Sequence, residues 1–294
     1  AYIEFKPFHI KGGSQALSNT LLDAYLQAGG DVWFNCGARE ILVADGCITG
    51  VVTDAGDRID TGHVVSNAST LTTYVDLIDK AHIPDDRLRE LGARTVGTSF
   101  VNVFLGFDCE PPDLGITEAT NFLATNSDIE AVYRKTRTLA APEAMLFTCY
   151  DVDDPDFSPP GACQATLVGL VYAEPWLAVP PHQYFDTKIR IAGQMLETLY
   201  RVFPKCRGHI EELEIGTPVT HMRYLGHPGG AAYGFDQSAK DNEFFLDRKS
   251  PIKGLFHVGA WSGMGGFQPT LMSGFSASRA VVRSLQNRKG GQHA

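Results

Sequence analysis

The chain contains 294 residues, of which 44% are hydrophobic and 20% are charged, so one large or two medium hydrophobic cores are expected. The formal net charge of -9 and the lack of a Lys/Arg cluster exclude a nucleic-acid binder, because neutralising phosphates requires a basic surface. No apolar run approaches the roughly 20 residues that a membrane-spanning helix needs, and residues 1–11 lack the apolar core of a secretory signal. The sequence therefore predicts an acidic, cytoplasmic protein with two lobes.

Six cysteines are scattered through the chain, and none belongs to a C-x-x-C pair of the kind that marks zinc or dithiol sites. We therefore expect reduced, mostly buried thiols and no metal site. These cysteines are Cys36, Cys47, Cys109, Cys149, Cys163 and Cys206.

The beginning of the chain predicts a compact unit that combines one helix with several strands. Leucines at helical spacing favour a helix over residues 12–28, with Ser14 as its candidate N-cap and two glycines as its stop. Short strands are expected at residues 31–34, on both sides of a turn at Asp45-Gly46, and over residues 58–69.

Residues 72–250 differ in composition from the preceding segment, because they contain more prolines and longer connections. They predict a second lobe. Runs rich in Phe, Val and Leu at residues 98–108 and 164–173 predict buried strands. An apolar stripe near residues 184–203 predicts an amphipathic helix.

Residues 251–286 return to apolar, glycine-rich sequence and predict a strand at 255–258, a glycine loop and a helix over 269–285, with a frayed end. A loop that leads from a strand into a helix presents backbone N–H groups and a positive helix dipole to anions or electron-rich rings. The same glycines also suit a plain tight connection, so the loop alone leaves both interpretations open. Gln268 occupies the position of the last glycine of a G-x-G-x-x-G fingerprint, which the chain therefore lacks.

Three segments, taken in order, carry a resemblance to a known family. They are KGGSQALSNTLLDAYLQAGGDVWFNCGAREILVADGCITGVVTDAGDRIDTGHVVSNA, the proline-rich middle lobe, and GLFHVGAWSGMGGFQPTLMSG. Together they resemble the FAD-dependent phytoene desaturase, carotenoid isomerase and retinol saturase group of the amine-oxidase-like flavoproteins. The resemblance implies an α/β (α+β) fold in which residues 1–71 and 251–294 form the C-terminal part of an incomplete Rossmann-like FAD-binding domain of the glutathione-reductase type. Residues 72–250 would form a mixed-sheet substrate-binding domain.

The family's cofactor contacts can be transferred to this chain by position. The hairpin after the first helix contacts the adenine side of FAD in that family, which implies Ala38 here, and the stretch that closes the dinucleotide domain implies Asn67 and Ala68. The C-terminal glycine loop would lie against the pyrophosphate, ribityl chain and flavin ring, and the helix that starts near Pro269 would point at the ring. The loop residues implied in FAD binding are Gly259, Ala260, Gly265, Gly266, Phe267 and Gln268.

Residues 220–237 (THMRYLGHPGGAAYGFDQ) resemble the family's loop that returns from the substrate lobe towards the flavin. Gly234 would then allow close approach to the ring, and Tyr233 would shape the substrate pocket. A surface turn is the alternative interpretation, because Pro-Gly-Gly is a common turn sequence. His227 is expected to be solvated or capped, and His257 to be packed and hydrogen-bonded, so neither is expected to be catalytic.

The resemblance implies hydride transfer between a C–C bond of an apolar polyene or isoprenoid and flavin N5, with FAD as the cofactor. Peripheral membrane contact is a further expectation. Because the glycine turn is absent, the chain is expected to be inactive without an N-terminal Rossmann half, supplied by a partner chain in a hetero-oligomer or by a lost segment. The alternative is a non-catalytic scaffold or binding subunit that keeps the oxidoreductase shape.

Overall fold

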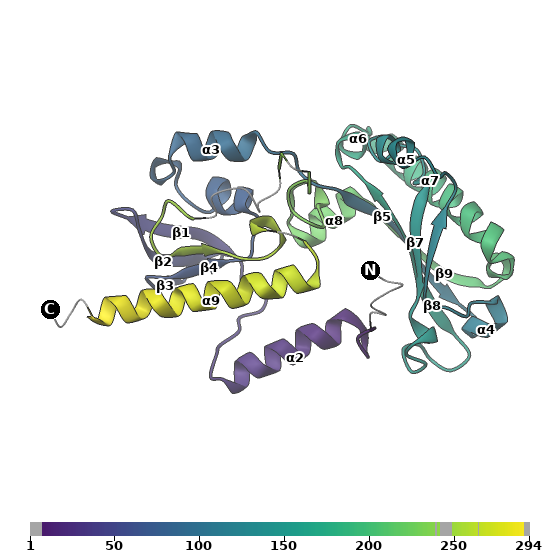
Figure 1. The fold of residues 1–294 in the computed structure, drawn as a ribbon, viewed down its shortest axis with the longest axis horizontal. Helices are drawn as coiled ribbons and strands as arrows, with labels where there is room; N and C mark the ends of the chain where they lie inside the picture. Colours follow the sequence, from purple (N-terminus) through teal and green to yellow (C-terminus); the bar gives the residue numbers. More distant parts are fainter. Residues whose placement is uncertain (1–7, 239, 242–248, 264, 291–294) are drawn as a thin grey trace. The chain divides into compact units, whose positions relative to one another are not determined.

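A computed structural model describes residues 8–238, 240–241, 249–263 and 265–290, which form two compact units (Figure 1). Unit 1 comprises residues 1–34, 100–171 and 175–217, and unit 2 comprises residues 35–99, 172–174 and 218–294. These bounds differ from the expected domain division, because residues 72–99 and 218–238 pack within unit 2 and the first helix packs within unit 1. The division into a cofactor domain and a substrate domain stays a prediction.

Unit 1 is built on a five-stranded sheet with the strand order β6-β7-β8-β5-β9. Its strands are β5 (Ser99–Phe107), β6 (Thr120–Ala124), β7 (Ala144–Cys149), β8 (Cys163–Val171) and β9 (Ile210–Gly216). The pairs β6–β7, β7–β8 and β5–β9 are antiparallel. The strands that the sequence predicted at residues 98–108 and 164–173 are confirmed as β5 and β8.

Alternate residues of this sheet separate into a buried face and an open face, as the period of two in a strand requires. In β5, Val101 and Val103 are fully buried, whereas Phe104 on the other face is 45% exposed. Helix α7 (Pro181–Val202) runs along the sheet with a buried stripe of Ile191, Ala192, Met195 and Leu199 (Figure 1). This helix confirms the one predicted near residues 184–203, and a proline in its first turn suits a helix start.

Short helices complete unit 1. They are α2 (Gly13–Gln27), α4 (Pro111–Leu114), α5 (Ile129–Lys135) and α6 (Glu174–Leu177), with 3₁₀ turns at Tyr150–Val152 and Pro204–Gly208. The predicted N-cap of the first helix is wrong: α2 begins at Gly13, so Ser14 lies inside it. Gly12 precedes the helix in a left-handed conformation and donates its N–H to Asp154 at 2.7 Å.

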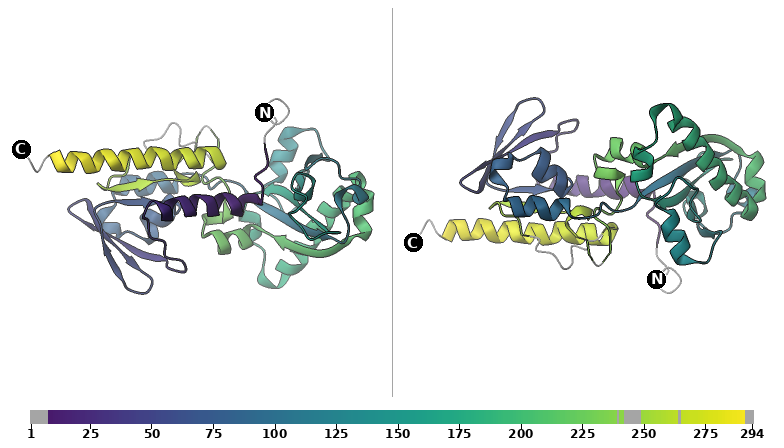
Figure 2. Two further views of the ribbon diagram at one scale, coloured as in Figure 1. Left: turned by 90° about the horizontal axis from the view of Figure 1, so that it is seen from below. Right: turned by 90° about the horizontal axis from the view of Figure 1, so that it is seen from above.

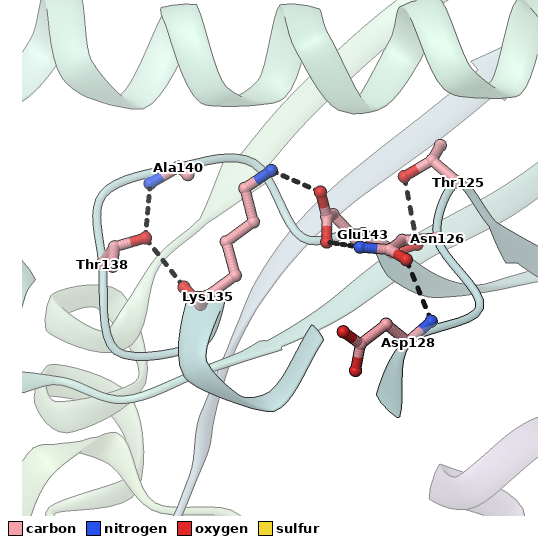
Figure 3. A network of polar contacts seen from close by, with 7 residues as sticks. All are labelled: Thr125, Asn126, Asp128, Lys135, Thr138, Ala140 and Glu143. Carbon is pink, nitrogen blue, oxygen red and sulfur yellow. Dashed lines mark hydrogen bonds and ion pairs between the residues drawn. The ribbon is translucent and has the colours of Figure 1, made fainter. Parts of the chain in front are cut away.

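A polar network closes the loop that joins α5 to β7 (Figure 3). Lys135 at the end of α5 lies 2.5 Å from Glu143, which also accepts a hydrogen bond from the side chain of Asn126 at 3.0 Å. The hydrogen bond from Lys135 and then that from Asn126 lower the pKa of Glu143. Asn126 in turn accepts the N–H of Asp128 at 2.9 Å, so the two ends of α5 are joined to one carboxylate.

Unit 2 combines a three-stranded antiparallel sheet, β1 (Ala38–Ala44), β2 (Cys47–Thr53) and β3 (Arg58–Asp60), with a parallel pair, β4 (Val64–Ser66) and β10 (Leu255–His257). The predicted turn is confirmed, since Asp45 and Gly46 both have positive φ between β1 and β2, as a two-residue hairpin turn requires. Figure 2 shows this hairpin projecting from the rest of unit 2.

Three elements that the sequence predicted differ from those in the structure. Residues 31–34 form no strand, and residues 58–69 form two short strands with different partners, because only β4 lies beside β10. The last helix, α9, runs over Phe267–Gly290, so it starts two residues before Pro269 and continues through the segment expected to fray. Residues 291–294 of that segment lie outside the described residues.

The core of unit 2 lies between the two small sheets and a set of short helical segments. These are a π-helical turn at Thr72–Asp76, 3₁₀ turns at Lys80–His82 and Pro228–Gly230, α3 (Asp85–Gly92) and α8 (Pro218–Leu225). Tyr74, Phe235, Leu255 and Trp261 belong to one buried cluster of this core. All six cysteines are free, but only Cys149, Cys163 and Cys206 are buried, so the expectation of mostly buried thiols holds for half of them. None of the described helices combines the length and apolar character that crossing a bilayer requires.

Candidate cofactor-binding site

The candidate site lies where the two parallel strands of unit 2 end. Because β4 and β10 are parallel and pair Ser66 with His257, the residues that follow them emerge at the same edge. The N–H of Val258 donates to the carbonyl of Ser66 at 2.9 Å, which extends the ladder by one residue. Asn67 and Gly259, which the sequence placed near a cofactor, are thereby brought side by side.

Gly259 fits this edge only as glycine. Its φ of 85° and ψ of -170° belong to a region that residues with a Cβ essentially avoid. A Cβ at this position would also lie 2.0 Å from Oδ1 of Asn67. The Gly259 N–H donates to the hydroxyl of Ser273 in α9 at 2.8 Å, and that hydroxyl donates to the carbonyl of Thr270 at 2.6 Å. One serine therefore ties the strand end to the last helix.

The predicted return loop packs directly against the glycine loop. A Cβ on Gly234 would lie 2.6 Å from the carbonyl oxygen of Ala260, and a Cβ on Gly265 would lie 2.2 Å from the ring of Tyr233. Two segments far apart in sequence thus approach closely because both carry glycine at the contact. The structure brings together Tyr233, Gly234, Gly259, Ala260 and Gly265, although Tyr233 itself remains 38% exposed.

The start of α9 completes the edge. Gly266 accepts the first helical hydrogen bond, from the N–H of Thr270 at 3.1 Å, and Phe267 and Gln268 follow it in exposed positions. The amides of a first helical turn have no acceptor within the helix, and Pro269 contributes none. The helix dipole adds partial positive charge at the same point. The Phe267 and Gln268 amides are therefore suited to bind an anion.

Trp261 anchors the glycine loop in the core of unit 2. Its side chain is 1% exposed and packs edge-on against Phe235, with ring centroids 5.1 Å apart, and against His227 at 5.8 Å. His227 is capped as expected, because its Nδ1 lies 3.2 Å from the carbonyl of Ala231. The backbone on both sides of Trp261 is thus held by aromatic packing: Gly259 and Gly263 are buried, and among the described residues of the loop only Gly266 is exposed.

His257 differs from its predicted state. It packs against Tyr74, with ring centroids 4.9 Å apart, but neither ring nitrogen has a hydrogen-bond partner among the described residues, although both are buried. Burial, followed by the positive charge of Arg87, lowers the pKa of His257 to about 4, so the ring is neutral at physiological pH. The expected packing is confirmed, and none of the described residues provides the expected hydrogen bond.

A cavity of about 620 Å³ lies beside the glycine loop and along α9. Its walls include His257, Gly259, Ser262, Met272 and Ser276, which come from β10, the loop and the last helix. Small residues on α9 leave this space open, and Lys249 and Lys253 add positive charge at its margin. All of these residues belong to unit 2.

Two predicted cofactor residues are placed less directly. Ala68 is half-buried and follows Asn67 at the strand end. Ala38 is exposed at the start of β1, pairs with Thr53, and makes no described hydrogen bond to the glycine loop. The structure therefore groups the strand-end and loop residues and leaves Ala38 apart from them.

A dinucleotide cofactor fits this arrangement. Paired parallel strand ends, glycines without side chains and an exposed helix start together provide close backbone approach and free amides for a pyrophosphate. Asn67, Gly259, Gly265, Gly266 and the Phe267 and Gln268 amides are the groups that would hold it. Sequence reasoning missed Ser273 and Trp261, whose support of the loop no local motif signals.

Comparison with known proteins assigns the chain to a group. No family model matches it. It is 25% identical to the chloroplastic prolycopene isomerase of Daucus carota over 84% of this chain and 39% of that protein. It is 24% identical to all-trans-retinol 13,14-reductase of Danio rerio, over 92% and 49%, and 22% identical to the lycopene-forming phytoene desaturase of Pseudescherichia vulneris, over 92% and 55%. The chain is a relative of the phytoene desaturases, prolycopene isomerases and retinol 13,14-reductases.

Solved structures agree with the fold of this desaturase-related chain. An oxidoreductase from Methanosarcina mazei matches with a TM-score of 0.58 at 17% identity, over 90% of this chain and 55% of that one. Cyclohexylamine oxidase from Brevibacterium oxydans matches with a TM-score of 0.57 at 15% identity, over 93% and 53%. The mixed α/β fold expected from the sequence is therefore shared with these solved structures. The chain spans about half the length of the curated relatives that it matches.

Proposed function

We propose that this chain forms part of an FAD-dependent oxidoreductase that transfers hydride between a C–C bond of an apolar polyene or retinoid and flavin N5. The observation that carries the proposal is the glycine-lined edge of unit 2, where Gly259, Gly265 and Gly234 sit at close contacts that a Cβ would block. FAD, when bound, supplies the hydride acceptor or donor. The chain's own residues then bind and orient the cofactor and the substrate.

In this proposal the loop lies against the pyrophosphate, ribityl chain and flavin ring, and the start of α9 points at the ring. The Phe267 and Gln268 amides donate hydrogen bonds, and the α9 dipole stabilises negative charge by about 0.3–2 kcal/mol. Ser273 fixes the distance between the loop and the helix through its two hydrogen bonds. Tyr233, packed over Gly265, would border the substrate.

The open face of the unit 1 sheet is evidence in favour of an apolar substrate. Phe122 on β6 pairs with Leu146 on β7, which pairs with Val168 on β8, so these three side chains form a row across the sheet. Phe104 on β5 and Leu170 on β8 also lie on the open face, and their side chains are 45% and 43% exposed. Apolar area that is left uncovered in this way marks a surface for a ligand or partner. A long polyene fits it without needing a charged group.

The names of the relatives favour the same substrate class. Prolycopene, phytoene and all-trans-retinol are the compounds that those names contain. Because the relatives include a desaturase, a reductase and isomerases, we propose the substrate class and leave the direction of the reaction to experiment.

We further propose that the glycine-rich phosphate turn is supplied by polypeptide outside these 294 residues, either on the same chain or on a partner. The sequence contains no G-x-G-x-x-G fingerprint, and the relatives are about twice as long as the aligned region. Each 1.4 kcal/mol of missing contact weakens cofactor binding about tenfold. The chain on its own should therefore bind FAD weakly.

The test is the absorbance spectrum and mass of the natively purified protein, followed by incubation with phytoene, prolycopene and all-trans-retinol. Flavin bands, together with conversion of at least one polyene, are the expected result. A colourless protein that takes up no FAD, even with its natural partner or flanking sequence present, would refute the proposal and favour a scaffold subunit.

A further inference from the structure

A second cluster of reactive side chains lies in unit 1, at one end of its sheet. Asp108 and Cys109 directly follow β5, and His209 directly precedes β9. Because these strands are antiparallel and pair Phe107 with Ile210, the three residues meet at the same point. The Asp108 N–H donates to the carbonyl of His209 at 3.1 Å, which extends the ladder beyond the last paired residues.

The side chains of this trio converge. One nitrogen of His209, the sulfur of Cys109 and one carboxylate oxygen of Asp108 all lie within 4.8 Å of one another. Nδ1 of His209 is 2.8 Å from Oδ1 of Asp108, and these two side chains are 45% and 52% exposed. An ion entering from solvent can therefore reach all three groups.

The charges around the trio favour a cation. Burial raises the pKa of the Cys109 thiol, and the nearby carboxylates of Asp108 and Asp113 raise it further, whereas Lys205 opposes them. Two carboxylates and one lysine therefore lie near the thiol, so the local net charge is negative and attracts a cation.

We propose that Asp108, Cys109 and His209 bind a zinc-type divalent cation. Nitrogen, sulfur and oxygen donors are the ligands that Zn²⁺ uses, at about 2.0–2.3 Å, and three protein ligands plus a water complete its tetrahedron. Ligand atoms around such an ion stand roughly 3.3–3.8 Å apart, so Nδ1 of His209 and Oδ1 of Asp108, which are 2.8 Å apart, must separate to admit it. The exposed Asp108 and His209 side chains allow that adjustment.

Binding would proceed by exchange of protons for the ion. The Cys109 S–H bond breaks and its proton leaves to solvent, the His209 ring gives up any proton on Nδ1 to solvent and carries its N–H on Nε2, and all three groups donate electron pairs to the cation. No oxidation or reduction takes place. The ion would join the end of β5 to the beginning of β9 in addition to the ladder bonds, and this inference is independent of the proposed flavin chemistry.

The experiment titrates the full chain with Co²⁺, a spectroscopic substitute for Zn²⁺, and then measures Zn²⁺ affinity by competition with a chromophoric chelator. Wild-type protein should bind one Co²⁺ with a thiolate-to-cobalt charge-transfer band. Cys109→Ser should abolish the band, and His209→Gln should weaken Zn²⁺ binding by about 100-fold, at or above the effect of losing an outer-shell partner. Cys36→Ser, which removes an exposed thiol of unit 2, is the matched control and should change neither.

A second readout separates metal binding from a simple ion pair. Zn²⁺ should raise the thermal unfolding midpoint of the wild-type chain and of the Cys36→Ser variant, and should leave that of Cys109→Ser unchanged. The proposal is overturned if saturating Co²⁺ gives no thiolate band, if the band survives in Cys109→Ser, or if it is lost in Cys36→Ser. In those cases Asp108 and His209 form an ion pair that closes the sheet end.

Discussion

Replacing Gly259 by alanine tests the candidate site most directly. The backbone at this residue has φ 85° and ψ -170°, a conformation that costs an L-residue about 1–3 kcal/mol. The new Cβ would also lie 2.0 Å from Oδ1 of Asn67. Because Asn67 is exposed, its amide can rotate away, so the backbone strain stays while the steric clash is relieved. The variant should lose about 1–3 kcal/mol of unfolding free energy.

Urea unfolding of the full chain measures this loss. Gly46→Ala is the matched control for left-handed strain without a clash, since its φ is 68° and nothing lies within 4 Å of its Cβ. It should cost about 1–2 kcal/mol. Adding Asn67→Ala to Gly259→Ala removes the clash. The double variant should regain only the unfolding free energy lost beyond the cost of the strained backbone.

Cofactor binding provides the decisive arm of this test. If the strand end holds FAD, Gly259→Ala should weaken FAD binding in the complete, flavin-containing protein by about tenfold for each 1.4 kcal/mol of lost contact, whereas Gly46→Ala should leave it unchanged. A Gly259→Ala protein that equals the wild type within 0.5 kcal/mol in stability and binds FAD normally would show that the reasoning is wrong.

Three other predictions concern the surroundings of this loop. Ser273→Ala removes the acceptor of the Gly259 N–H and should cost about 1 kcal/mol in urea unfolding, with Ser278→Ala as an exposed control; an equal loss in both would contradict the assignment. His257→Phe should flatten the pH dependence of the unfolding free energy. In the wild type, the lowered pKa of His257 destabilises the folded state by up to about 3 kcal/mol as the pH falls from 6.5 towards about 4. An unchanged pH dependence in the variant would argue against a buried neutral ring. Gly274→Ala, inside α9 with open space around it, should raise the thermal midpoint through a gain of up to about 1 kcal/mol, and a lower midpoint would indicate a contact there.

Much of the fold could be predicted because its signals are local. The period of two in β5 and β8, the stripe of α7 and the two-residue turn at Asp45-Gly46 are readable from neighbouring residues. The strand expected at residues 31–34 was wrong because an apolar run does not form a strand without a partner strand. The end of α9 was missed because its charged residues remain good helix formers.

Individual residues of the candidate site were predicted from the sequence, but their arrangement in space was not. Glycines at 234, 259 and 265 signalled close approach, but only the fold shows which segment each one approaches. Ser273 gave no signal, since a serine within a helix usually bonds its own backbone. The Asp108, Cys109 and His209 trio was likewise invisible, because its members come from two strands and follow no metal-binding spacing. Long-range pairing decides such sites, and a single sequence does not state it.

The parallel pairing of β4 with β10 has a consequence for how the protein is made. The two strands lie far apart in the sequence, so unit 2 cannot close its core until the ribosome has released β10 and the glycine loop. The sheet of unit 1 depends on residues that are all synthesised earlier, and it can form first. Pairing of such high sequence separation folds slowly, because loop closure must precede the contacts that reward it. During that interval the backbone groups of β4 that later pair with β10 would lack that partner.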